Sequence, residues 1–264
     1  MLVLTLAARG GVSAALRALT KIFSGRHDMD EVNDVTMQKA GGAAAGSDQL
    51  SQLSALYRDL LRCRRCPGMF GPPVYGQAVI SPVMMIGQAP GTKEIEQCRP
   101  FCWTAGKTLF RWFQSIGMDE ATFRERVLMS AVCRCFPGKN PKAGDRVPDR
   151  LEVENCSGWW RGEMQISRPR LIIPVGKLAI AQFADQLPAG ARLDGLVGQQ
   201  WPYRSAAGLT ADLIPLPHPS GASTWFKMEP GKSLLHAGLG LIAAHPAWQD
   251  LLRRHIVEPS SHNA

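Results

Sequence analysis

The sequence predicts an α/β fold, a three-layer α/β/α sandwich around a short, mainly four-stranded parallel sheet. Four short apolar segments have strand character, and segments with helical periodicity lie between them. Alternation of strands with helices is typical of a parallel sheet that helices cover on both faces. The chain has 264 residues, of which 45% are hydrophobic, enough for one large domain or two small ones with a sizeable core.

The predicted elements follow one another after a Gly/Ala-rich run at residues 41–46. Leucines at helical spacing predict an amphipathic helix over residues 48–62. Strands are expected at 83–86, 127–132, 171–175 and 213–216, and helices at 105–116, 149–165, 176–186 and 231–243. Ligand sites in such sheets lie at the carboxyl ends of the strands. We therefore expect the chemistry in two loops, Gly87 to Gly91 and Pro217 to Gly221.

The two ends of the chain differ in composition from the rest. The first 27 residues contain four basic residues and no Asp or Glu, as in a weak targeting peptide. Met29 and Met37 are alternative starts, so residues 1–46 are expected to be a disordered extension or part of an over-long gene model. Residues 47–258 are expected to form a single domain, and residues 259–264 a frayed polar tail.

Charge and hydropathy narrow the class of protein. Lys and Arg outnumber Asp and Glu by 30 to 22, a net charge of +8, which favours a polyanionic partner such as nucleic acid. No stretch approaches the roughly 20 apolar residues of a membrane-spanning helix, which excludes an integral membrane protein. The seven cysteines are an odd number, and no secretory signal precedes them, so metal or cluster ligation in a reducing cytosol is favoured over a disulfide framework.

Four cysteines are candidate ligands. Cys63 and Cys66 form a CxxC motif after the first predicted helix, Cys135 lies in a Pro/Gly-rich loop, and Cys156 falls in a predicted helix. Four thiolates suit either tetrahedral zinc or a [4Fe–4S] cluster, and spacing alone does not separate the two. The alternative is a set of unconnected buried thiols. Three cysteines remain, of which the last could replace Cys135 as a ligand: Cys98, Cys102 and Cys133.

Taken in order, the motifs resemble those of the uracil-DNA glycosylase superfamily, particularly its iron–sulfur families 4 and 5. Those families carry a CxxC, a GEAPG or GLAPA motif, a GxPFxGxAGxLL segment, a loop cysteine, a helix cysteine and an HPS motif. Here the chain reads CxxC at 63–66, GQAPG at 87–91, CRPFCWTAGKTL at 98–109, then Cys135, Cys156 and His218-Pro219-Ser220. The resemblance covers about residues 48–245. It implies a [4Fe–4S] cluster on Cys63, Cys66, Cys135 and Cys156, and hydrolysis of the bond that joins a base to deoxyribose.

The chain departs from these families at several motif positions. Gln88 replaces the Glu of family 4, and Ala89 stands where the best-known family has the Asp that orients the attacking water. Ala131 replaces the Asn that reads the edge of uracil, which removes a bidentate contact. Cys98 and Trp103 replace two glycines, and the spacing to the last cysteine is longer than usual. The chain therefore resembles a divergent member.

The resemblance also assigns roles to residues. Phe101 matches the aromatic residue that stacks on the flipped base, and His218 is placed to donate to a carbonyl oxygen of the departing base. Gln88 can orient water, and Glu94 is the nearest carboxylate that could act as a general base. We therefore expect these catalytic residues: His218, Gln88 and Glu94. The expected substrate-binding residues are Gln88, Ala89, Phe101, Ser130 and His218.

Contacts with the DNA backbone are expected from Ser220, Gly221 and Lys232, with Lys227 in the same segment. Further basic residues around the cysteines are expected on the binding face: Arg64, Arg65, Arg134, Lys139 and Lys142. The sequence thus predicts a monomeric, cytoplasmic, nucleoid-associated enzyme of base excision repair. It is expected to be a monofunctional glycosylase that removes uracil from DNA and leaves an abasic site. The alternatives are a glycosylase of broader range, including hypoxanthine, and a non-catalytic DNA-binding protein that carries a cluster or zinc.

Overall fold

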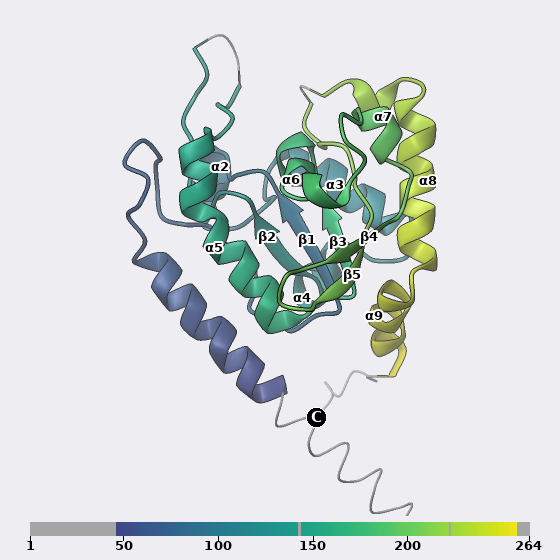
Figure 1. Cartoon of the computed structure of the whole chain (residues 1–264), viewed down its shortest axis with the longest axis horizontal. Coiled ribbons are helices and arrows are strands. Elements are labelled where there is room, and N and C mark those ends of the chain that lie inside the picture. Colours follow the sequence, from purple (N-terminus) through teal and green to yellow (C-terminus); the bar gives the residue numbers. More distant parts are fainter. Residues whose placement is uncertain (1–45, 142–143, 222, 258–264) are drawn as a thin grey trace, which may run out of the picture. The chain divides into compact units, whose positions relative to one another are not determined.

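The computed structural model describes residues 46–141, 144–221 and 223–257 (Figure 1). Except for Gly46, the predicted N-terminal extension lies outside these residues, as does the predicted polar tail.

A five-stranded sheet forms the centre of the described domain (Figure 1). Its strands are β1 (Val83–Gly87), β2 (Leu128–Ala131), β3 (Leu171–Pro174), β4 (Trp201–Arg204) and β5 (Thr210–Leu213), in the order β2-β1-β3-β5-β4. Four strands are parallel, and β4 pairs with β5 in the antiparallel direction. The predicted fold class is therefore confirmed, with one additional edge strand.

Two details of the sheet differ from the prediction. The last parallel strand is at Thr210–Leu213 rather than at residues 213–216, although Leu216 still forms an isolated parallel bridge with Val175. Strand β4 was not predicted because it is short and contains Pro202. Proline lacks the N–H that a central strand needs, so it is confined to edge strands such as this one.

Helices connect the strands. A helix at residues 46–61 precedes the sheet. The others are α2 (Thr92–Gln97), α3 (Thr104–Gln114), α4 (Glu120–Arg126), α5 (Arg150–Ser167), α6 (Lys177–Ala181), α7 (Leu193–Leu196), α8 (Gly231–Ala244) and α9 (Pro246–Val257), with short 3₁₀ turns at Ala184–Gln186 and Trp225–Lys227. None of the described helices is both long and apolar enough to cross a membrane.

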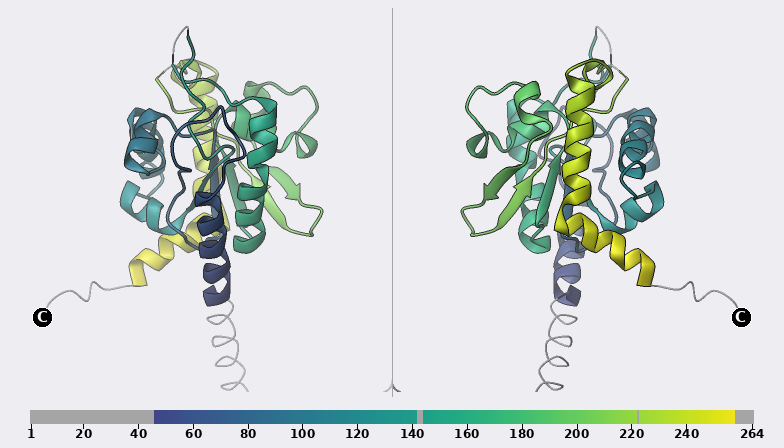
Figure 2. Two further views of the ribbon diagram at one scale, coloured as in Figure 1. Left: turned by 90° about the vertical axis from the view of Figure 1, so that its left-hand side faces the viewer. Right: turned by 90° about the vertical axis from the view of Figure 1, so that its right-hand side faces the viewer.

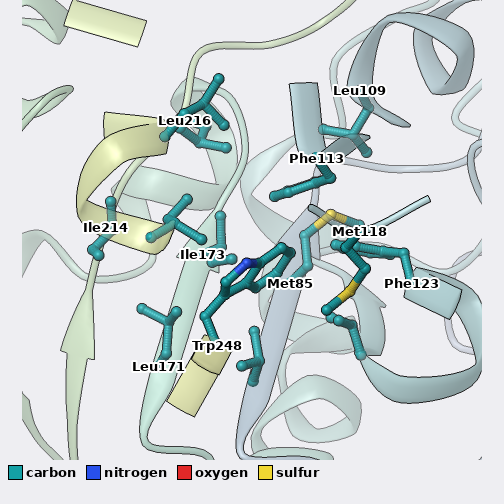
Figure 3. Packing of buried hydrophobic residues seen from close by; sticks show 14 of the residues in the cluster. Met85, Leu109, Phe113, Met118, Phe123, Leu171, Ile173, Ile214, Leu216 and Trp248 are labelled. Atoms are coloured by element: carbon teal, nitrogen blue, oxygen red, sulfur yellow. The ribbon is translucent and has the colours of Figure 1, made fainter. Parts of the chain in front are cut away.

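The helices cover both faces of the sheet, as alternating side chains on β1 show. Val83 and Met85 pack in one hydrophobic cluster with α3, α4, α8 and α9, whereas Met84 and Ile86 pack in a second cluster with α5 and the helix at 46–61. Figure 2 shows α3 and α4 on one side of the strands and α5 on the other. Figure 3 shows the first cluster, in which Trp248 lies among side chains of the sheet and of α3.

The strand order places the candidate site. From β1 the chain proceeds to β2 on one side, and β3 lies on the other side of β1. Such a change of direction opens a crevice at the carboxyl ends of the strands. The loops after β1, β2 and β3 and the segment that follows β5 meet at this end of the sheet.

Candidate active site

A small pocket opens at the carboxyl ends of β1 and β2, beside the segment that follows β5. We call it the strand-end pocket. Its volume is about 190 Å³, below the roughly 300–1,000 Å³ of pockets for drug-sized ligands. The residues predicted to act in catalysis and substrate binding all line it: Gln88, Ala89, Glu94, Phe101, Ser130 and His218. The fold therefore brings together motifs from distant parts of the sequence around a space for a ligand of about one ring system.

Phe101 and two glycines shape one wall of this pocket. Phe101 has a left-handed backbone (φ 51°), which is unusual for a residue with a side chain. A Cβ on Gly87 would come within 2.9 Å of the Phe101 ring, and a Cβ on Gly106 within 1.8 Å of the Phe101 carbonyl oxygen. Arg124 fixes the turn by donating to the carbonyl oxygens of Pro100 at 2.8 Å and of Phe101 at 3.0 Å. The ring is thus pressed against the backbone of β1, in a place that only glycines permit.

His218 lies in a position suited to donate a hydrogen bond. Its Nδ1 accepts a hydrogen bond from the backbone N–H of Ser220 at 3.3 Å, so in the neutral ring the proton is on Nε2. Burial lowers the pKa of His218 below its usual value, which keeps the ring neutral at pH 7. Gly176 (φ 88°) leaves room for the imidazole, because a Cβ there would come within 2.9 Å of its Cδ2.

Gln88 in the GQAPG motif and Glu94 just after it both line the pocket, but their surroundings differ. Gln88 follows β1 directly and lines the pocket. The Glu94 carboxylate also lines the pocket, but its Oε2 accepts a hydrogen bond from the Gly91 N–H at 3.2 Å and so caps α2. Ala131 pairs with Gly87 across the two strands and lines the pocket, and its side chain is only a methyl group.

Ser130 belongs to a buried polar network behind the pocket. Its hydroxyl donates to the Glu163 carboxylate at 2.6 Å and accepts from Arg134 Nη2 at 2.7 Å. Arg134 also forms an ion pair with Glu163, and their side chains are 1% and 0% exposed. The prediction that Arg134 belongs to a DNA-binding surface is therefore wrong, since burial in an ion pair keeps this guanidinium away from solvent.

Arg134 also lines a second cavity, of about 540 Å³, which we call the cysteine cavity. The four predicted ligands line it together: Cys63, Cys66, Cys135 and Cys156. They come from the loop after the first helix, from the loop after β2, and from α5. Cys133 is fully buried in the hydrophobic core and does not line this cavity. Cys98 and Cys102 lie elsewhere, on the segment between α2 and α3.

The chemistry of these thiols fits a bound cationic group. Burial and the neighbouring thiols Cys156, Cys63 and Cys66 raise the pKa of Cys135 to about 11. Four thiolates in one cavity repel one another, and metal cations supply the charge that offsets this repulsion. No three of the described His, Cys, Asp or Glu side chains converge closely enough to hold a single metal ion. Four thiols around one cavity are the donor set of either a zinc ion or a [4Fe–4S] cluster.

These observations agree with comparisons to known proteins. A family model, the Uracil DNA glycosylase superfamily, matches residues 73–237. The chain belongs to this superfamily. The resemblance inferred from the motifs is confirmed at this level.

Three individual relatives can be compared with this chain by sequence identity and by the share of each chain that is covered. The chain is 30% identical over 139 residues to the type-4 uracil-DNA glycosylase of Archaeoglobus fulgidus, covering 51% of this chain and 64% of that protein. It is 28% identical over 172 residues to the type-4 uracil-DNA glycosylase of Pyrobaculum aerophilum, covering 64% and 83%. A match to the type-5 uracil-DNA glycosylase of Pyrobaculum aerophilum is 34% identical but spans only 65 residues, 25% of this chain and 26% of that protein. The match to the first of these relatives thus spans less than two thirds of its length.

The residues predicted to contact DNA are only partly gathered at the site. Ser220 lines the strand-end pocket, and Gly221 follows it and is exposed. Lys232 is exposed on the first turn of α8 and lines neither the pocket nor the cysteine cavity. Lys142 lies outside the described residues.

A larger groove of about 1280 Å³ runs from the strand-end pocket along α6 and α7 and shares Gln88 and His218 with it. Two cations that the sequence analysis did not single out, Lys177 and Arg192, line this groove. No sequence motif marks them, because they lie at the start of the short helices α6 and α7, whose course depends on the fold. The strand-end pocket is also lined by four residues that the sequence analysis did not assign to it: Tyr75, Trp103, Arg134 and Asp145.

Proposed function

We propose that this protein is a monofunctional DNA glycosylase that hydrolyses the N-glycosidic bond of uracil in DNA and leaves an abasic site, as a step of base excision repair. One observation carries the proposal. A pocket of about 190 Å³ brings an aromatic ring, a neutral imidazole donor and water-orienting polar groups together at the strand ends. Relatives of the same superfamily are named type-4 uracil-DNA glycosylases, which supports this activity and substrate.

In the proposed reaction the target nucleotide first leaves the DNA stack, because the glycosidic bond is inaccessible inside a duplex. The base stacks on Phe101, a contact that contributes roughly 1–3 kcal/mol. Backbone groups of the turn at Gln88 and Ala89 contact the base, and Ser220 with Gly221 holds the flanking phosphates. Lys177, Arg192 and Lys232 add positive charge for the DNA backbone.

Bond cleavage puts positive charge on the sugar and negative charge on the departing base. The Nε2–H of His218 donates to a carbonyl oxygen of that base and stabilises the developing charge. A neutral imidazole suffices for this role, which agrees with the lowered pKa of His218. Gln88 orients the attacking water, and the Glu94 carboxylate lies close enough to the pocket to assist it.

We further propose that Cys63, Cys66, Cys135 and Cys156 hold one [4Fe–4S] cluster. The cluster acts structurally, because hydrolysis of an N-glycosidic bond transfers no electrons. The four cysteines that would hold it come from the loop after the first helix, the loop after β2 and α5, so a bound cluster would join these segments. The seven cysteines of the described residues are free thiols. We propose that the protein acts in the cytoplasm as a monomer on DNA.

A second candidate function is a glycosylase with a broader range of deaminated bases, hypoxanthine among them. The observation that favours it is Ala131, whose methyl group brings no hydrogen-bonding atom to the pocket wall. The neighbouring Ser130 hydroxyl does not replace the missing contact, because Glu163 and Arg134 already engage it. Strict discrimination for uracil is therefore weaker here than in a pocket that has an Asn at this position.

Incubation with labelled oligonucleotides tests both candidates. We expect a uracil-containing strand to be cleaved by alkali after incubation, which reveals abasic sites, and a matched thymine-containing strand to stay intact. Cleavage of a hypoxanthine-containing strand at a similar rate favours the broader range. Binding of uracil-containing DNA without alkali-labile sites contradicts both and favours a non-catalytic DNA-binding protein.

A further inference from the structure

A carboxylate from outside the known motifs reaches the strand-end pocket. Asp145 lies in the loop between β2 and α5, and it lines the pocket together with Gln88 and His218. Its Oδ2 comes within 2.9 Å of the position that a Cβ on Gly91 would occupy, and Glu94 Oε2 comes within 3.0 Å of the same position. Two carboxylates from separate parts of the chain therefore converge over one glycine that has no side chain to keep them apart.

Residues 138–140 and 144–146 pair through their backbones and present Asp145; we call this paired segment the hairpin. Lys139 and Asp145 form an antiparallel bridge, and the N–H of Arg146 donates to the carbonyl oxygen of Gly138 at 2.8 Å. Lys139 Nζ also donates to Asp145 Oδ1 at 2.7 Å. This ion pair occupies Oδ1 and leaves Oδ2 on the side of Gly91. The side chain of Asp145 is 39% exposed, so a substrate and its attacking water can reach it.

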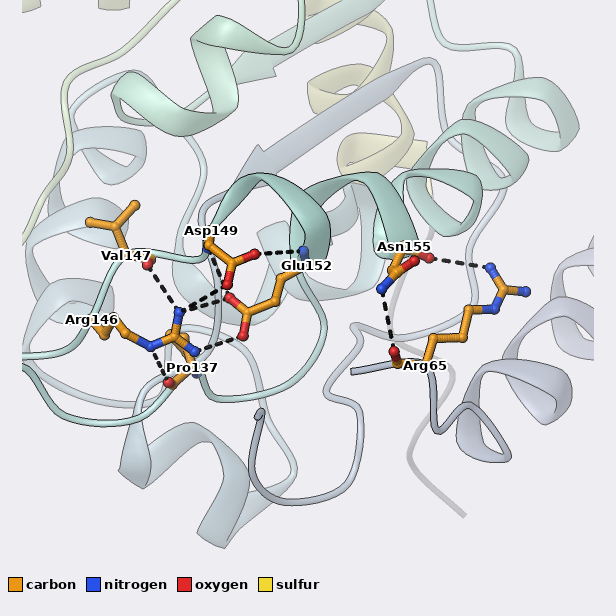
Figure 4. Close-up of polar contacts among 7 residues, drawn as sticks. All are labelled: Arg65, Pro137, Arg146, Val147, Asp149, Glu152 and Asn155. Atoms are coloured by element: carbon orange, nitrogen blue, oxygen red, sulfur yellow. Dashed lines mark hydrogen bonds and ion pairs between the residues drawn. The ribbon is translucent and has the colours of Figure 1, made fainter. Parts of the chain in front are cut away.

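Arg146 anchors this hairpin to α5 (Figure 4). Its Nη1 and Nη2 donate to the two carboxylate oxygens of Glu152 at 2.8 and 2.6 Å, and its Nε donates to the Pro137 carbonyl oxygen at 2.8 Å. Glu152 also accepts from the Asp149 N–H and completes the N-terminal cap of α5. A bidentate Arg–carboxylate pair fixes both position and orientation, so the neighbouring Asp145 is held rather than loosely tethered.

The first motif lacks the groups that a water-activating role requires. Gln88 and Ala89 have an amide and a methyl side chain, and neither accepts a proton from water. The Glu94 carboxylate is partly committed, because it caps α2 through the Gly91 N–H. Asp145 comes from the segment between Cys135 and Cys156. This segment thus brings to the pocket a carboxylate that the first motif lacks.

We propose that Asp145 is the general base for the attacking water, an inference that rests on the proposed glycosylase function. The water oxygen forms a bond to C1′ of the deoxyribose while the bond between C1′ and the base breaks. The electron pair of that bond leaves with the base, and His218 stabilises its charge. One proton of the water passes to Asp145 Oδ2 and later reaches the departed base through solvent, which restores the carboxylate.

Single-turnover excision of uracil from a labelled oligonucleotide tests the proposal on the full chain. General-base catalysis typically contributes 10²–10⁴-fold, so we expect Asp145→Asn to be slowed by about 100-fold or more. Its affinity for uracil-containing DNA should be that of the parent or slightly higher, since a negative charge is lost. Added formate should restore part of the rate of Asp145→Ala, a response that a structural residue does not show. Glu154→Gln, which removes an exposed carboxylate from α5, is the charge-matched control and should behave as the parent.

The outcomes separate this inference from the proposed function. A parent that releases no uracil contradicts both. If the parent is active and Asp145→Asn excises within about threefold of it, only the role of Asp145 is overturned. A loss of rate that Glu154→Gln shares, or that parallels an equal loss of DNA affinity, overturns it as well.

Discussion

The strand-end pocket and the cysteine cavity both contact Arg134, but they depend on different properties of the chain. The cysteine cavity depends on side-chain identity, since four thiols from three segments line it. The strand-end pocket depends on backbone shape as much as on the chemistry of its side chains. Phe101 has a left-handed backbone, and positions 87 and 106 beside it have no room for any side chain, so only glycine fits there. Replacing one sulfur atom, as in Cys→Ser, should therefore damage the cysteine cavity. Adding one carbon atom, as in Gly→Ala, should damage the strand-end pocket.

The largest expected effect is at the cysteine cavity. Cys135→Ser should lack the visible absorbance and the bound iron that we expect of the purified parent, with a large loss of solubility, because one corner of the proposed cluster is left without a thiolate. Cys133→Ser is the matched comparison, since Cys133 is near in sequence and its thiol is hydrogen-bonded to Cys156, but it does not line the cavity. Iron content and absorbance of the two variants give the comparison. A brown Cys135→Ser with a bleached Cys133→Ser would show that the third ligand is assigned wrongly.

The next largest effect is expected in the buried network of Ser130, Arg134 and Glu163, which lies between the strand-end pocket and the cysteine cavity. Glu163→Ala leaves the buried guanidinium of Arg134 without its partner. Removal of one member of a buried ion pair typically costs about 3–5 kcal/mol, so the free energy of unfolding in urea should fall by that amount. Glu154→Ala removes an exposed carboxylate from the same helix and should change it by less than about 0.5 kcal/mol. Equal effects of the two substitutions would contradict a special role for the buried pair.

A smaller effect on stability is expected from one added methyl group at the pocket. A Cβ on Gly106 would come within 1.8 Å of the Phe101 carbonyl oxygen, so Gly106→Ala must displace the turn that carries the ring. Overpacking of this kind typically costs about 1–3 kcal/mol, and excision should fall with it. Gly158→Ala on α5 is the control, because nothing lies within 4 Å of a Cβ there. Unchanged excision by Gly106→Ala would show that the backbone shape around Phe101 is not required.

The smallest effect is expected from deletion of residues 1–46. The described domain begins at Gly46, and all residues assigned to the pocket and to the cysteine cavity follow it. The thermal midpoint and the excision rate should therefore match those of the full chain. A truncated protein that binds DNA much more weakly would instead place the basic N-terminal segment in the interface.

The two sites also differ in how far the sequence predicts them. The four cysteines of the cavity can be predicted from the CxxC and the two later cysteines. Ligation by thiolates requires a single residue type, and the fold of the parallel sheet positions the segments that carry them. For the pocket, motif order predicts Phe101 and His218, since Phe101 lies in the segment between α2 and α3 that follows the first apolar run, and His218 comes soon after the last one. The sequence does not predict Asp145, whose place at the pocket depends on a hairpin held by the pair of Arg146 with Glu152.

Arg134 is the clearest failure of local reasoning. Its charge and its position between two cysteines suggested a surface residue, but the deciding partner, Glu163, lies on α5 and comes close only in the folded chain. Strand β4 and helix α4 were missed for a related reason. Short or partly polar segments have little periodicity of their own, and tertiary packing decides their structure.

The central claim is that the strand-end pocket releases a base by stabilising the charge on it through His218. Single-turnover excision of uracil by His218→Ala, measured beside its affinity for uracil-containing DNA, tests this claim most directly. Loss of one such donor typically costs about 2.7–4 kcal/mol of transition-state stabilisation, roughly a hundred- to thousand-fold in rate. We expect a loss of this size with nearly unchanged affinity, a milder loss in Gln88→Ala, and parent behaviour in His236→Ala, which changes an exposed histidine of α8. A His218→Ala protein that excises uracil within about threefold of the parent would contradict the account.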